Sequence, residues 1–70
     1  MTTMKGRNVN KRNGFYEVYN TGGWGNHHTS KKDAMRAMED TNRYSEAKHG
    51  ERIVSRVVQV KEGEVVGEWQ

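Results

Sequence analysis

Four basic side chains near the start of the chain are the residues whose types and spacing best indicate a function. Residues 1–13 contain no acidic residue and carry Lys5, Arg7, Lys11 and Arg12. The other eight of the twelve Lys and Arg residues stand against nine acidic residues, so residues 14–70 have a net charge of −1. Basic side chains on a flexible arm can neutralise phosphates and release counterions. The charge distribution therefore predicts that any attraction to nucleic acid depends mainly on this arm.

Aromatic side chains on the following strands could support such binding, because aromatic rings on an open sheet can stack on nucleic-acid bases. We expect Tyr16 and Trp24 to help the arm in this way. A second hypothesis is a protein-binding inhibitor or adaptor that acts through the open sheet face, with Phe15, Tyr19 and Trp24 as anchors.

Other chemistry has little support in the sequence. His27 and His28 are adjacent, so in a strand they point to opposite faces, and no pair of ligands has the spacing of a structural zinc site. No Ser lies in a Gly-flanked elbow, and the chain contains no Cys. The Gly-rich stretch at residues 21–25 is followed by a predicted strand, which favours a hairpin turn over a phosphate cradle. We expect no enzymatic activity, metal or cofactor.

We expect the chain to consist of a flexible basic arm, residues 1–13, and a single domain, residues 14–70. Aromatic and β-branched residues predict a strand at 15–19, and residues 24–29 a second, antiparallel strand after a turn at 21–23. Alternation places Phe15, Glu17 and Tyr19 on one face, and Tyr16 and Val18 on the other. Alternatively, residues 8–12 form a short strand and Asn13-Gly14 a tight turn.

A helix is predicted from Ser30 to Gly50. Ser30 can cap its first turn, and Gly50 can end it. The spacing predicts a buried face made of Ala34, Ala37, Met38, Thr41, Tyr44 and Ser45.

Two further strands are expected at residues 52–61 and 64–69, joined by a turn at Glu62-Gly63. Imperfect alternation in the first means that both its faces are partly buried or that a bulge shifts its phase. In the second, Val65, Gly67 and Trp69 should face one way. The predicted fold is α+β, with chain order β-β-α-β-β and one helix packed on one face of an antiparallel sheet. The open face should then carry some of Phe15, Tyr19, Val57 and Trp24.

The size of the chain limits its core and suggests where it works. Seventy residues make one domain, and with a hydrophobic fraction of 31% a homodimer would be one way to enlarge a thin core. No apolar run is long enough to span a bilayer, so we expect no membrane partner. The lack of Cys fits a cytoplasmic location, or the host cytoplasm if the protein is viral.

Three stretches, residues 11–19, 22–24 and 29–34, resemble the arm-type, AP2-like DNA-binding domains at the N-termini of tyrosine integrases. The resemblance covers about residues 11–42. It implies that the sheet enters the major groove, with Lys11, Arg12, Tyr16 and Trp24 near DNA. The chain departs from the family pattern at Asn26-His27-His28 and in the Val-rich hairpin of residues 53–69. Its size and layout are also similar to small phage accessory proteins, including anti-defence and host-takeover inhibitors, which implies a phage or bacterial origin and, for the second hypothesis, a host-protein partner.

Overall fold

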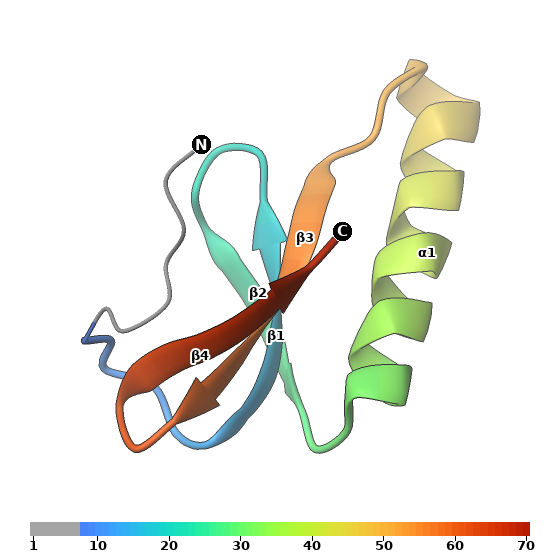
Figure 1. Ribbon diagram of the computed structural model, residues 1–70. Coiled ribbons are helices and arrows are strands. Elements are labelled where there is room, and N and C mark those ends of the chain that lie inside the picture. The colour runs from blue at the N-terminus through green and yellow to red at the C-terminus, as the bar shows by residue number, and fades with distance from the viewer. Residues whose placement is uncertain (1–7) are drawn as a thin grey trace.

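The structure is a computed structural model, and it describes residues 8–70 (Figure 1). Its elements follow the order β1 (Gly14–Tyr19), β2 (Trp24–His28), α1 (Lys31–His49), β3 (Val54–Lys61) and β4 (Glu64–Trp69). The strands form one antiparallel sheet with the spatial order β2-β1-β3-β4. The predicted α+β fold and its chain order are confirmed.

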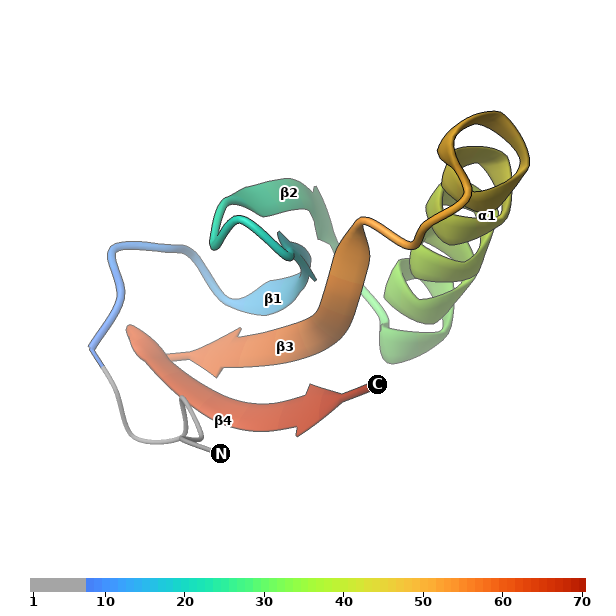
Figure 2. The same ribbon diagram turned by 90° about the horizontal axis from the view of Figure 1, so that it is seen from above.

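The helix covers one face of this sheet. Its main chain lies close to β3, β1 and β2 but not to β4, which it meets through side chains at Trp69. Figure 2 shows the helix standing to one side of the curled sheet. The strand pair β1–β3 therefore forms the centre of the domain, while β2 and β4 are the two edges.

Local chemistry explains where the helix begins and ends. Ser30 is extended, with φ of −138°, and its hydroxyl accepts a hydrogen bond from the Asp33 N–H at 3.2 Å. Gly50 adopts the left-handed conformation, with φ of 76°, and its N–H donates to the Glu46 carbonyl. Both predicted helix ends are confirmed.

The helix face that meets the sheet differs from the predicted one at two positions. Ala34, Met38 and Ser45 are buried as expected, but Tyr44 is 63% exposed. Asn42 is buried in its place, and its amide bonds to the main chain of Ile53 and Val54 at the start of β3. These main-chain groups are shielded from water, so they need hydrogen-bond partners within the protein. The Asn42 side chain supplies them and thereby fastens the helix to the sheet.

Two apolar clusters lie on opposite faces of the sheet. The cluster under the helix contains Ala34, Met38, Val54 and Val57, with Phe15, Tyr19, Met35 and Trp69 packed against it. The cluster on the face away from the helix, here called the distal face, contains Tyr16, Val18, Val58, Val60 and Val65, with Val9 and Trp24 packed against it. Apolar side chains are therefore buried on both faces of the sheet within one chain.

This arrangement corrects the predicted open face. The open face was expected to carry some of four residues. Trp24 does lie on the distal face, whereas Phe15, Tyr19 and Val57 pack under the helix. Alternation identified correctly which β1 residues share a face, but it could not show which face the helix would cover, because that depends on the connection from β2 to α1.

Irregular pairing explains the mixed patterns of the last two strands. The β1–β3 register shifts between Val18 and Tyr19, and both faces of β3 are buried, so the two explanations for its imperfect alternation are both correct. The β3–β4 register shifts between Gln59 and Val60. Val65 consequently belongs to the distal cluster and Trp69 to the helix side, which overturns the prediction that they face one way.

Residues 8–13, here called the N-terminal segment, lie against the hairpin formed by β3 and β4. The Val9 N–H donates to the Gly63 carbonyl, and Asn8 forms an isolated bridge with Glu64. The Asn13 side-chain oxygen accepts from the Glu62 N–H at 2.8 Å. This part of the expected arm thus pairs with the β3–β4 turn, and not with β1 as the short-strand alternative required.

Candidate nucleic-acid interface

The hairpin of β1 and β2 brings the candidate residues together on the distal face. The Tyr19 N–H donates to the Gly23 carbonyl at 2.7 Å, and Gly22 has a φ of 96°, so the predicted turn at residues 21–23 is confirmed. Pairing then places Trp24 beside Val18 and His27 beside Tyr16. An irregularity in this register lets Trp24 and His27 both reach the Tyr16 ring.

Tyr16 is the centre of this group and is only 4% exposed. Its ring centroid lies 5.4 Å from that of Trp24 and 5.3 Å from that of His27. Its hydroxyl donates to the main-chain oxygen of Arg12 at 2.9 Å. Such a buried ring supports its neighbours and holds the N-terminal segment in place. It does not offer an exposed surface on which a base could stack.

Lys11 lies over two of these rings. Its ammonium is 5.6 Å from the Trp24 centroid and 5.8 Å from the Tyr16 centroid. At an exposed site a cation over an aromatic ring contributes about 0.5–1 kcal/mol. The two rings partly order the Lys11 side chain. Because Lys11 is exposed, its charge stays accessible to an anion.

Arg12 is placed by His27. A guanidinium nitrogen of Arg12 lies 3.3 Å from His27 Nδ1, and His27 Nε2 lies 2.8 Å from the Asn13 carbonyl oxygen. Gly14 allows this approach, since a Cβ there would come within 2.2 Å of His27 Nε2, and its φ of 148° also favours glycine.

The structure therefore brings together four of the predicted nucleic-acid-binding residues, Lys11, Arg12, Tyr16 and Trp24. Lys5 and Arg7 lie outside the described residues. Sequence reasoning missed His27, which it considered only as a possible zinc ligand. The position of His27 opposite Tyr16 could have indicated the role of His27. That position depends on the register of the β1–β2 hairpin, which cannot be predicted from the sequence because the pairing is irregular.

The proposed protein-binding anchors do not share a surface. Phe15 and Tyr19 are half-buried on the helix side, while Trp24 is half-buried on the distal face. The helix side also holds a pair in which His28 Nε2 lies 2.6 Å from Glu17 Oε2, with Glu17 buried. As expected, His27 and His28 point to opposite faces of the sheet.

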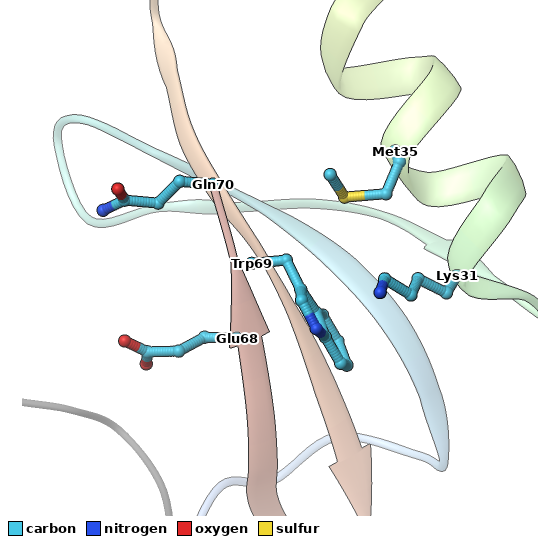
Figure 3. A pocket seen from close by; sticks show the side chains of 5 residues that line it. All are labelled: Lys31, Met35, Glu68, Trp69 and Gln70. Carbon is cyan, nitrogen blue, oxygen red and sulfur yellow. The ribbon is translucent and has the colours of Figure 1, made fainter.

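A hollow lies between the start of α1 and β4. Figure 3 shows Met35 and Lys31 of the helix reaching toward Trp69, while Glu68 and Gln70 point away from the helix. The Lys31 ammonium lies 4.5 Å from the Trp69 centroid. The hollow exists because the main chain of α1 does not cover β4, and Lys31 already lies over the Trp69 ring.

Comparisons with known proteins add no further constraint. No family model, curated protein or solved structure matches the chain. The resemblance to integrase arm-type domains therefore stays a prediction. Within residues 8–70, no three His, Asp or Glu side chains gather where they could hold a metal ion, and α1 is too polar to cross a membrane.

Proposed function

We propose that the chain is a small non-enzymatic module that binds nucleic acid by contacting phosphates through Lys11 and Arg12. The observation that carries this proposal is the placement of these two adjacent, exposed cations on a supported platform. Lys11 lies over the Tyr16 and Trp24 rings, and Arg12 is held by His27 and through its carbonyl by Tyr16. Ordering a cation before binding lowers the conformational entropy lost in the complex.

The arrangement favours phosphate contact over base stacking. The Tyr16 ring is buried, and the Trp24 ring is shared with the Lys11 ammonium. Both aromatic residues thus act as supports for the cations. Lys5 and Arg7 add two more positive charges to the same end of the chain. Phosphate contacts position a protein on nucleic acid without reading its sequence, so we expect weak base preference.

Fluorescence anisotropy of a labelled DNA duplex and single strand tests this proposal. The full chain is compared with a Lys11→Gln/Arg12→Gln variant and with a Lys32→Gln/Arg43→Gln variant, which loses the same charge from the exposed side of α1. Each phosphate contact contributes roughly 0.9 to the slope of log K against log salt on duplex DNA. The first variant should therefore lose about 1.8 from the slope, and the second should keep nearly all of it.

Equal effects of the two variants would mean that only net charge matters and would contradict a site at Lys11 and Arg12. If the full chain binds neither the DNA duplex nor the single strand at low salt, the proposed function is wrong. A protein partner then becomes the better hypothesis, with Trp24 as the remaining anchor on the distal face.

A further inference from the structure

We infer that His27 is a positioning residue for Arg12 and that its protonation tunes phosphate binding at this site. The inference rests on the proposed function and concerns the same surface. It starts from the two hydrogen bonds of the His27 ring, which join it to the N-terminal segment at Arg12 and Asn13.

The partners of the two ring nitrogens define which one carries the proton. The Asn13 carbonyl can only accept, so Nε2 at 2.8 Å must be the N–H donor. The Arg12 guanidinium can only donate, so Nδ1 at 3.3 Å must be the acceptor. The arrangement therefore requires a neutral imidazole with its proton on Nε2. In this form His27 links the end of β2 to the N-terminal segment.

A second proton would break this arrangement. Protonated Nδ1 becomes a donor and presents its N–H, together with a positive charge, to the cationic guanidinium. The described contacts of the ring are with Arg12, Asn13 and Tyr16, and Lys11 lies over the same Tyr16 ring. None of these groups is acidic, so no carboxylate among them would offset the added charge.

Acidification should strengthen phosphate binding, because the imidazolium adds a positive charge beside Lys11 and Arg12. A bound phosphate would supply the negative charge that the described contacts of this ring lack. One added contact corresponds to a slope change of roughly 0.9, which at about 0.1 M salt is an affinity gain of about fivefold to tenfold.

The first test is nitrogen-15 NMR of the histidine rings in the free, full-length protein at about pH 8, where histidine is ordinarily neutral. We expect the His27 proton on Nε2, and Arg12→Gln should change the Nδ1 signal while leaving that of His49 unchanged. A proton on Nδ1, or an Nδ1 signal unaffected by Arg12→Gln, would overturn the positioning role. This measurement does not depend on nucleic acid.

The second test is duplex affinity between about pH 8 and about pH 5.5, the range in which histidine ordinarily changes charge. Wild type and the exposed control His49→Gln should gain affinity on acidification. His27→Gln should lose this gain, although its amide can still donate to Asn13. An equal gain in duplex affinity in His27→Gln would overturn the claim that protonation of His27 tunes binding. If neither the duplex nor the single strand binds at any pH, the proposed function is wrong, while the ring measurement would still decide whether His27 holds Arg12.

Discussion

The hydroxyl of Tyr16 donates a hydrogen bond to the main-chain oxygen of Arg12 at 2.9 Å. This bond joins the most buried aromatic residue of the distal face to one of the two cations that the proposed site presents. It explains how a small sheet can order a basic segment that has few apolar residues of its own. The Tyr16 hydroxyl thus connects the buried distal cluster to the exposed N-terminal segment.

Replacing Tyr16 by Phe should destabilise the domain by about 1 kcal/mol, because the ring stays while the net contribution of one hydrogen bond is lost. The matched control is Tyr44→Phe, which removes a hydroxyl from a residue that is 63% exposed. Urea denaturation measures the free energy of unfolding of both variants. A loss in Tyr44→Phe equal to that in Tyr16→Phe would contradict the role of the Arg12 contact.

Asn42 should be the polar residue of α1 on which stability depends most. Its amide accepts from the Ile53 and Val54 N–H groups and donates to the Val54 carbonyl, and its side chain is buried. Asn42→Ala leaves these groups without partners, which should cost about 2–4 kcal/mol.

The neighbouring control for Asn42 is Arg43→Ala, which removes an exposed side chain whose ion pair with Asp40 spans 3.8 Å. Exposed pairs contribute about 0–1 kcal/mol, so thermal unfolding should show a much smaller loss. Comparable melting temperatures for the two variants would show that Asn42 does not fasten the helix to β3.

The turn between β3 and β4 contains a correctable strain. Glu62 has a φ of 54° and Gly63 one of 79°, which is the pattern of a turn that prefers Asn-Gly. Glu62→Asn should stabilise the domain by about 0.5–1 kcal/mol, since Asn tolerates the left-handed conformation better. The main-chain bond from Glu62 to Asn13 is retained.

Glu62→Gln separates this conformational effect from the loss of a negative charge. It removes the same charge without gaining the preference for the left-handed region. Chemical denaturation should therefore show stabilisation in Glu62→Asn and little change in Glu62→Gln. Equal stabilisation of both variants would assign the effect to charge.

Features that depend on neighbouring residues could be predicted from the sequence, whereas those that depend on distant pairing could not. Ser30 and Gly50 define the helix because caps are local. Asn42 was missed and Tyr44 misplaced, since helical spacing favours an aromatic ring over an amide on the buried face. The buried amide is favourable only because the start of β3 supplies its partners.

The same distinction applies to the candidate site. The basic character of residues 1–13 is visible in composition, and Lys11, Arg12, Tyr16 and Trp24 were named together. The supporting role of Tyr16 and the part of His27 depend on an irregular hairpin register that no local signal specifies. Phe15 and Tyr19 were assigned to an open face because alternation does not show which face the helix covers.

The most direct measurement for the central claim is an NMR titration of the isotope-labelled full chain with a short DNA duplex at low salt. Binding through Lys11 and Arg12 predicts that the largest shift changes occur in the N-terminal segment, at the Trp24 indole and at the His27 ring. The exposed side of α1, including Lys32 and Arg43, should change little. Changes centred on α1 or on the hollow at Trp69, or none at any residue, would contradict the account.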